Sequence, residues 1–129
     1  MARAIAERVE AQRPRGFEVV MGEIGTFKRG SRARVVWLGL RTGAEALTQL
    51  AAQVETECVA AGLAAEQRPF TAHLTLARAR ERDGEVLPRL PGLPLLRPWR
   101  AAELILYSSH LGRAGATYEP LRAVRLEGG

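Results

Sequence analysis

The chain has 129 residues, 47% of them hydrophobic, so it is long enough for one domain with its own core, and no apolar run is long enough to cross a bilayer. Its single cysteine and 2 histidines exclude a disulfide framework and disfavour a metal site within one chain, and we expect a cytoplasmic protein with no cofactor and no signal peptide. The net charge of +5 comes from arginine, which suits contact with phosphate but also arises from a GC-rich genome.

The first half of the chain predicts one helix and then two strands. Ile5 and Val9, four residues apart, indicate the helix, and no capping residue precedes it. The second strand is apolar enough to be covered on both faces. The first strand is expected over residues 16–27 and the second over residues 34–40, with a basic turn over residues 28–34 between them.

A longer helix is predicted next. Thr42 and Glu45 form a T-x-x-E capping box at its start, and Gly62 supplies its end. Cys58 lies on the inner stripe, so we interpret it as a small core residue rather than a nucleophile. The stripe consists of Leu47, Leu50, Ala51, Val54, Cys58 and Ala61.

The second half predicts three more strands. The first lies in PFTAHLTLAR, residues 69–78, and the last two end at Tyr107 and Leu126, joined by turn residues over 108–116. The connection between the strand at 69–78 and the last two strands contains Pro88, Pro91, Pro94 and Pro98, which exclude an ordinary helix or central strand there. We predict an extended loop for it and hold a polyproline ligand as the less favoured alternative. This order of elements predicts an α+β domain with antiparallel sheet and outer helices.

The strand at residues 69–78 carries the candidate chemistry. Alternation places His73 and Thr75 on one face and apolar residues on the other. Imidazole transfers protons near neutral pH, and a threonine hydroxyl donates hydrogen bonds to phosphoryl oxygens. Arg78 would join them only if the strand bulges or ends near Ala77. The alternative is that His73 has no catalytic role and is a strand residue hydrogen-bonded to a neighbour.

The wider sequence resembles the 2H phosphoesterases, in the branch of 2'-5' RNA ligases and RNA 2',3'-cyclic phosphodiesterases. PFTAHLTLAR is similar to the second HxT signature of this family, and GTFKRGSRARVVWLGL to the two strands before it. LILYSSHLGRAGATYEPL resembles the closing hairpin. The resemblance therefore covers most of the chain.

This resemblance implies two α+β lobes, each giving one HxT strand to a groove, and catalysis without metal. His73 would act as an acid or base, Thr75 as a phosphoryl donor, Arg78 as a phosphate-binding residue and Tyr118 as a groove wall. The expected substrates are RNA 2',3'-cyclic phosphate ends or small nucleotides, opened to 2'-phosphates, with 2'-5' ligation as a second activity. No membrane partner is expected.

The chain departs from this family in its first signature. His110 is the other histidine, and we expect it at the surface, in the closing turn. Residues 1–129 are thus expected to form a single domain that lacks the N-terminal strand, helix and first HxT strand of the family. Three interpretations follow: a late start or fragment of a cyclic phosphodiesterase, a homodimer that pairs two copies of His73, or a non-catalytic module that binds RNA ends or nucleotides.

Overall fold

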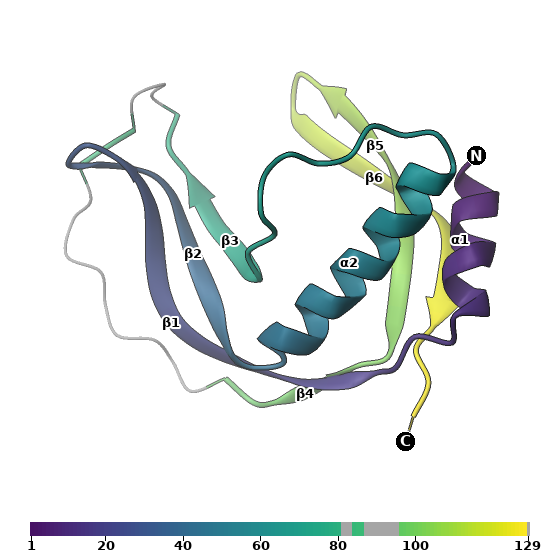
Figure 1. The fold of residues 1–129 in the computed structure, drawn as a ribbon. Coiled ribbons are helices and arrows are strands. Elements are labelled where there is room, and N and C mark those ends of the chain that lie inside the picture. The colour runs from purple at the N-terminus through teal and green to yellow at the C-terminus, as the bar shows by residue number, and fades with distance from the viewer. Residues whose placement is uncertain (81–83, 87–95, 129) are drawn as a thin grey trace. The chain divides into compact units, whose positions relative to one another are not determined.

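The computed structural model describes residues 1–80, 84–86 and 96–128. Contacts divide the chain into two units, each described by itself. The terminal unit comprises Met1–Phe17, Gln49–Pro69 and Arg100–Gly129, and the central unit comprises Glu18–Thr48 and Phe70–Trp99. The elements in chain order are α1 (Ala2–Ala11), β1 (Phe17–Arg29), β2 (Arg32–Thr42), α2 (Ala44–Ala60), β3 (His73–Arg78), β4 (Trp99–Ala101), β5 (Glu103–Gly112) and β6 (Gly115–Arg125) (Figure 1).

The helix expected at the start of the chain is present as α1. Its buried residues Ile5, Ala6 and Val9 lie on one face because they are spaced by three and four residues. Met1 at its N-terminus makes no side-chain capping hydrogen bond, so this end lacks the usual stabilisation. Packing of the apolar face against β6 therefore carries most of the stability of α1.

The second helix, α2, begins one residue later than its sequence pattern predicts. Thr42 is the last residue of β2, and the amide of Leu47 donates to the carbonyl of Gly43 at 2.9 Å. The capping box is therefore wrong: β2 holds Thr42 in its pairing with Val20, and no hydrogen bond of the described residues joins its hydroxyl to the helix.

The predicted end of α2 is confirmed. Gly62 has a φ of 104°, and its amide donates to the carbonyl of Val59 at 3.0 Å. The amide of Leu63 reaches the carbonyl of Cys58, also at 3.0 Å. These two bonds close a Schellman motif, for which glycine is the favoured residue because it adopts a positive φ without strain.

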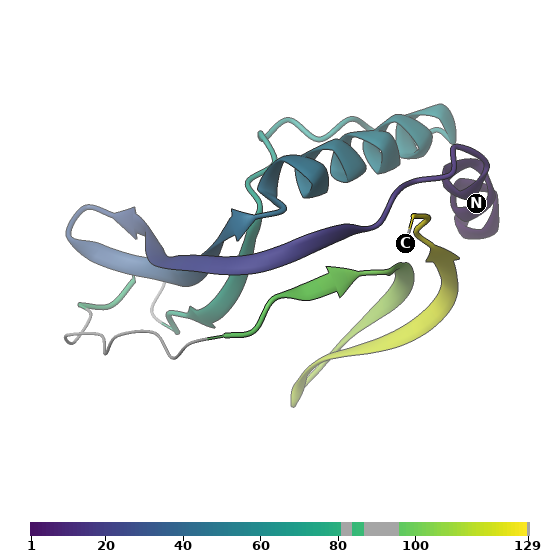
Figure 2. The ribbon, with the colours of Figure 1, turned by 90° about the horizontal axis from the view of Figure 1, so that it is seen from below.

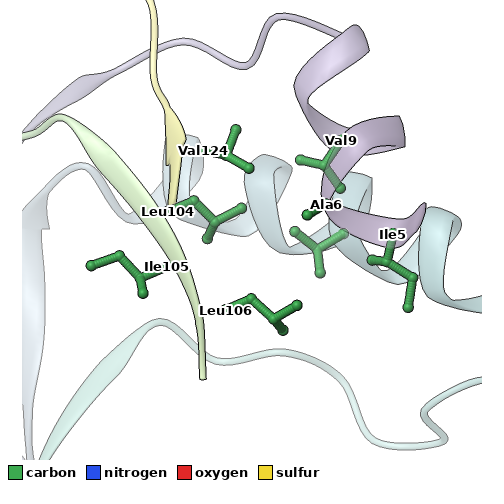
Figure 3. A pocket seen from close by; sticks show the side chains of 8 residues that line it. Ile5, Ala6, Val9, Leu104, Ile105, Leu106 and Val124 are labelled. Atoms are coloured by element: carbon green, nitrogen blue, oxygen red, sulfur yellow. The ribbon is translucent and has the colours of Figure 1, made fainter. Parts of the chain in front are cut away.

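The core of the terminal unit lies between its helical segments and the antiparallel β5–β6 hairpin. Val9 and Val124 are each only 2% exposed. A pocket of about 100 Å³ remains beside them (Figure 3). Because its lining is entirely apolar, this pocket offers no groups for catalysis. Its lining residues are Ile5, Ala6, Val9, Val54, Leu104, Ile105, Leu106 and Val124.

One buried acid joins the two helical segments of the terminal unit. Glu57 is 7% exposed and accepts hydrogen bonds at 2.5 Å from Arg8 Nε and from Gln12 Nε2. A buried carboxylate is costly unless it is paired and hydrogen-bonded, and both conditions are met here. Its position on α2 breaks the apolar stripe that the sequence predicted.

The central unit is built on a hairpin of β1 and β2, with β3 antiparallel to β2 (Figure 1). The strand order of this sheet is β3-β2-β1-β4. Only Gly30 and Ser31 separate β1 from β2, and Gly30 has a φ of 62°. The predicted basic turn over 28–34 is therefore too long, because Lys28 and Ala33 still pair across the hairpin.

The predicted connection at residues 108–116 is also too long. β5 and β6 pair down to Gly112 and Gly115, which leaves Arg113 and Ala114 as the turn of the hairpin (Figure 2). Gly115 has a φ of 112°, so glycine permits this tight reversal. His110 lies on β5, opposite Thr117, and its predicted place in the turn is wrong.

The proline-rich connection is described only in part. Pro88, Pro91 and Pro94 lie outside the described residues, so the extended loop stays a prediction there. Within residues 1–80, 84–86 and 96–128, no helix is both long and apolar enough to span a membrane.

Candidate functional site

The candidate site is built on β3, where pairing with β2 sets the direction of each side chain. His73 lies opposite Gly39, and Thr75 lies opposite Trp37. Directly opposite residues of antiparallel strands share a face, and residues two apart on one strand share a face as well. His73 and Thr75 therefore project to the same side as Trp37, as the alternation predicts.

A β-bulge brings Arg78 to this same face. Val36 pairs with Ala77 and Trp37 pairs with Thr75, so Leu76 is the extra residue on β3. Arg78 consequently lies opposite Val35, two residues before Trp37. Without the bulge, strict alternation would send the guanidinium to the other face. The bulge that Arg78 needs in order to share this face is therefore present.

The imidazole of His73 is oriented by its own strand. Nδ1 lies 2.5 Å from the carbonyl oxygen of Thr71. A carbonyl only accepts, so Nδ1 carries the proton and donates it, which assigns the tautomer of the neutral ring. Nε2 is thereby left as the nitrogen that can exchange a proton with a bound molecule.

Two aromatic rings border this imidazole. Phe27 of β1 stands edge-on to His73 with ring centroids 5.3 Å apart, and Trp37 does so at 6.4 Å. Phe27 and Trp37 also contact each other at 5.5 Å. Sequence reasoning missed both as site residues, although the pairing of Phe27 with Val35 in a β1–β2 hairpin would have placed them on the face of His73.

These rings also change which face of β3 is covered. His73 and Thr75 are half-buried, whereas Leu74 and Leu76 are 51% and 50% exposed. Alternation groups the apolar residues on one face, as predicted, and that face is the more exposed one. Phe27 and Trp37 cover the polar face instead, so the candidate chemistry lies among aromatic side chains.

The Trp37 ring sits above a glycine of the neighbouring strand. Gly25 is the partner of Trp37 on β1, and a Cβ at this position would overlap the indole. The indole Nε1 is buried and has no acceptor within the described part of the chain. Packing, rather than a hydrogen bond, therefore holds this ring beside His73.

We expect Gly25→Ala to displace the Trp37 ring and to destabilise the central unit by about 1–3 kcal/mol, the usual cost of overpacking. The measurement is urea unfolding followed by the fluorescence of Trp37 in a Trp99→Phe background, since the chain has 2 tryptophans. Gly30→Ala is the control. It adds backbone strain, because the φ of Gly30 is 62°, but it adds no steric overlap, because nothing lies within 4 Å of its Cβ position. An unchanged Trp37 spectrum in Gly25→Ala would contradict this packing.

The remaining candidates lie in the terminal unit. Tyr118 of β6 is 64% exposed and stands edge-on to Tyr107, with centroids 6.3 Å apart. His110 is exposed, and its Nε2 lies 3.2 Å from Ser108 Oγ and 3.7 Å from Glu119 Oε2. The β3 site thus holds His73, Thr75 and Arg78 together, while Tyr118 and His110 belong to the other unit.

The order of these motifs is that of a known family. A sequence model of the 2'-5' RNA ligase superfamily matches residues 1–113. The chain belongs to this superfamily. The resemblance inferred from the HxT strand and the closing hairpin is confirmed.

Curated members of the superfamily are recognisably similar to this chain. An RNA 2',3'-cyclic phosphodiesterase of Escherichia coli is 32% identical over 107 residues, which cover 83% of this chain and 57% of the relative. An RNA 2',3'-cyclic phosphodiesterase of Aeropyrum pernix is also 32% identical, covering 97% of this chain and 73% of the relative. The chain thus spans little more than half of its E. coli relative.

Solved structures of the superfamily confirm the fold. E. coli LigT complexed with 3'-AMP superposes with a TM-score of 0.79 at 29% identity, covering 97% of this chain and 68% of LigT. LigT complexed with NADP+ gives 0.77 at 29% identity and covers 97% and 67%. The mixed helices and antiparallel sheets of this 2'-5' RNA ligase superfamily member are therefore those of the 2H phosphoesterase fold.

The single thiol of this superfamily member, Cys58, lies on the part of α2 that belongs to the terminal unit. Burial raises the pKa of Cys58, and the neighbouring charge of Glu55 raises it further. A raised pKa lowers the thiolate fraction at neutral pH, and the thiolate is the nucleophile. The raised pKa agrees with the prediction that Cys58 is not a nucleophile, but the residue is only partly buried and does not belong to the buried core.

We expect Cys58 to react with iodoacetamide at pH 7.5 more slowly than a free cysteine, and to speed up as the pH rises through the raised pKa. The measurement is the rate of alkylation by mass spectrometry, with the urea-unfolded chain as the control. Equal rates for folded and unfolded chain would contradict the burial of this thiol.

Proposed function

We propose that the β3 site acts on 2',3'-cyclic phosphates at RNA ends or in small nucleotides, with His73, Thr75 and Arg78 as its working residues. The observation that supports this proposal is the bulge at Leu76, through which residue 78 of β3 shares a face with His73 and Thr75. An imidazole, a hydroxyl and a guanidinium on one face suit a phosphate group.

The proposed reaction opens the cyclic ester to a 2'-phosphate. The oxygen of water forms a bond to phosphorus, the bond from phosphorus to the ribose 3'-oxygen breaks, and the leaving oxygen receives a proton. His73 Nε2 serves one of the two proton transfers, since Nδ1 is held by the carbonyl of Thr71. Thr75 donates to a phosphoryl oxygen, and Arg78 neutralises its charge.

The other proton transfer needs a second group. His73 is the only histidine of the central unit, and His110 lies on β5 of the terminal unit. A second copy of His73 in a homodimer, or a histidine outside these 129 residues, would meet this need. The chain spans 57% of the length of its E. coli relative, so the activity of the whole protein is part of the proposal.

The proposed partners are RNA ends or small nucleotides. Structures of E. coli LigT complexed with 3'-AMP, NADP+ and phosphate support this proposal. Tyr118 remains the proposed groove wall. In 2'-5' ligation the 5'-hydroxyl of a second RNA would attack phosphorus in place of water, and the bond from phosphorus to the 3'-oxygen would break as in hydrolysis. A single cysteine suits a reducing cytoplasm, which is the compartment we propose.

The deciding experiment is hydrolysis of a nucleoside 2',3'-cyclic phosphate, and of a short RNA ending in one, by the purified chain. Phosphorus NMR separates a 2'-phosphate from a 3'-phosphate product. Turnover to the 2'-isomer supports the proposal. A folded chain that gives no product, or the 3'-isomer, would overturn it for this chain.

A second candidate function is non-catalytic binding of RNA ends or nucleotides. It is favoured by the single imidazole of the central unit and by the net charge of +5. This function predicts nucleotide binding that weakens steeply with salt and is lost in Arg78→Ala, with no turnover at any pH. Turnover that depends on His73 would exclude it.

A further inference from the structure

The positive charge of the chain is concentrated in the central unit. This unit has ten arginine or lysine residues against six acids, which accounts for most of the net charge of +5. A GC-rich genome would add arginine to both units alike, so it does not explain this difference. Because a positive surface attracts polyanions such as nucleic acid, the basic side chains of this unit are candidates for contacts with phosphate.

The tip of the β1–β2 hairpin places one of these arginines on the face of the β3 site. Phe27 of β1 borders His73 on this face, so Lys28, the next residue of the strand, projects to the other face. Lys28 pairs with Ala33, and Arg32 precedes Ala33 on β2. Arg32 therefore projects to the same face as Phe27 and His73.

A backbone carbonyl holds the Arg32 side chain in place. Its Nε donates to the carbonyl oxygen of Gly84 at 3.1 Å. Gly84 has a φ of 88°, and a Cβ there would lie 2.7 Å from the carbonyl oxygen of Ala33 and 3.2 Å from Arg32 Cβ. This close approach therefore requires glycine. The hydrogen bond at Nε leaves the two terminal nitrogens of the guanidinium to bind an anion.

No ion pair of the described residues occupies this arginine. The ion pairs found within residues 1–80, 84–86 and 96–128 all belong to the terminal unit. Glu85, the residue after Gly84, lies opposite Ala33 and thus projects to the other face. Arg32 is also exposed, so its guanidinium is open to a phosphate group from solvent.

Arg32 lies at a distance from Arg78 that suits a polynucleotide. Arg78 is opposite Val35, and Arg32 is three residues from Val35 along β2, on the side away from the partner of His73, which corresponds to about 10 Å. Successive phosphates of a stacked strand are about 3.4 Å apart along its axis. A phosphate bound by Arg32 would therefore lie about three nucleotides from one bound by Arg78.

We propose that Arg32 forms a second phosphate site, which binds the backbone of a single-stranded RNA whose terminal cyclic phosphate occupies the β3 site. The inference rests on the proposed function, and it selects RNA ends over small nucleotides as the substrate class. A 2',3'-cyclic phosphate ends the RNA, so the rest of the chain leaves the β3 site on its 5' side. It would run from His73 past Phe27 toward the turn at Gly30 and Ser31. Phe27 is 40% exposed and offers its ring for stacking of one base.

The first test compares the binding of a six-nucleotide RNA carrying a 3'-phosphate with the binding of 3'-AMP, so it does not require turnover. Arg32→Gln should weaken binding of the RNA by about 3- to 30-fold, as expected for the loss of one charge-assisted contact with phosphate, and should weaken binding of 3'-AMP less. The slope of log affinity for the RNA against log salt should become shallower by about 0.7. Fluorescence anisotropy measures the RNA, and titration calorimetry measures 3'-AMP.

Lys28→Gln is the matched control for this variant. It removes one positive charge from the same hairpin tip, but on the other face, so affinity for the RNA should stay within about twofold. Equal weakening of RNA binding by Arg32→Gln and Lys28→Gln would overturn the inference. Equal weakening of RNA and 3'-AMP by Arg32→Gln would overturn it as well, and circular dichroism confirms that each variant is folded.

Hydrolysis of a nucleoside 2',3'-cyclic phosphate separates this inference from the proposed function. If the chain turns this substrate over and Arg32→Gln binds the RNA as tightly as the original chain, the proposed function stands and the second phosphate site is overturned. If Arg32→Gln weakens RNA binding selectively in a chain that shows no turnover, the second phosphate site is supported and the proposed reaction is overturned for this chain.

Discussion

Replacing His73 by alanine should lower the rate of cyclic-phosphate hydrolysis by about 100- to 10,000-fold, the usual contribution of one positioned proton transfer. The side chain is oriented by the Thr71 carbonyl and bordered by Phe27 and Trp37, so its Nε2 is held where one proton can be passed. The measurement is the initial rate of 2'-phosphate formation at saturating substrate.

His110→Ala is the matched control for this variant. It removes the other imidazole of the chain from an exposed position on β5, and the rate should stay within about twofold, as for an exposed residue outside the site. A loss of rate in His110→Ala equal to that in His73→Ala would contradict the assignment of the site to β3.

A related comparison separates catalysis from binding. Arg78→Ala should weaken binding of 3'-AMP more than His73→Ala does, because a guanidinium forms two charge-assisted hydrogen bonds with phosphate while an imidazole contributes one hydrogen bond. Titration calorimetry measures both affinities. A chain in which His73→Ala abolishes binding would show that this residue holds the ligand and does more than transfer a proton.

Among the variants that remove one partner of an ion pair, loss of the arginine partner of Glu57 should lower stability most. We expect Arg8→Met to lower the free energy of unfolding of the terminal unit by about 2 kcal/mol, below the 3–5 kcal/mol of a fully buried pair because the Arg8 side chain is half exposed. The Glu57 side chain is only 10% exposed, so the variant leaves this carboxyl group in a poorly hydrated place with Gln12 as its remaining partner.

A double-mutant cycle checks the cause of this loss. Arg8→Met combined with Glu57→Leu should be more stable than Arg8→Met alone, since no unpaired charge is then buried. Arg13→Met is the control, because its ion pair with Glu127 is exposed and should contribute nothing measurable. Urea unfolding of all variants gives the comparison. A double variant less stable than Arg8→Met would contradict this account.

The helices and the HxT face could be predicted from the sequence because both depend on local spacing. Ile5 and Val9 share a helix face because they are four residues apart, whatever the helix packs against. Gly62 ends α2 because it adopts a positive φ. His73 and Thr75 share a face wherever β3 pairs. The family resemblance could be predicted as well, because it depends on the linear order of motifs in the chain.

The errors arose where strands meet. Thr42, the basic residues after Phe27 and the segment around His110 were all predicted outside strands, and pairing with a partner strand extends each strand through them. A single strand does not determine where its pairing stops, because each further pair depends on the residue that lies opposite.

The sequence by itself thus determined the helices, the HxT strand and the superfamily, since these follow from periodicity and from motif order. Tertiary structure decided which groups meet. The bulge at Leu76 brought Arg78 to the face of His73, the β1–β2 hairpin added Phe27 and Trp37, and the approach of α1 to α2 gave Glu57 its partners. These contacts join residues distant in the chain, and pairing and packing between elements create them, which local pattern does not encode.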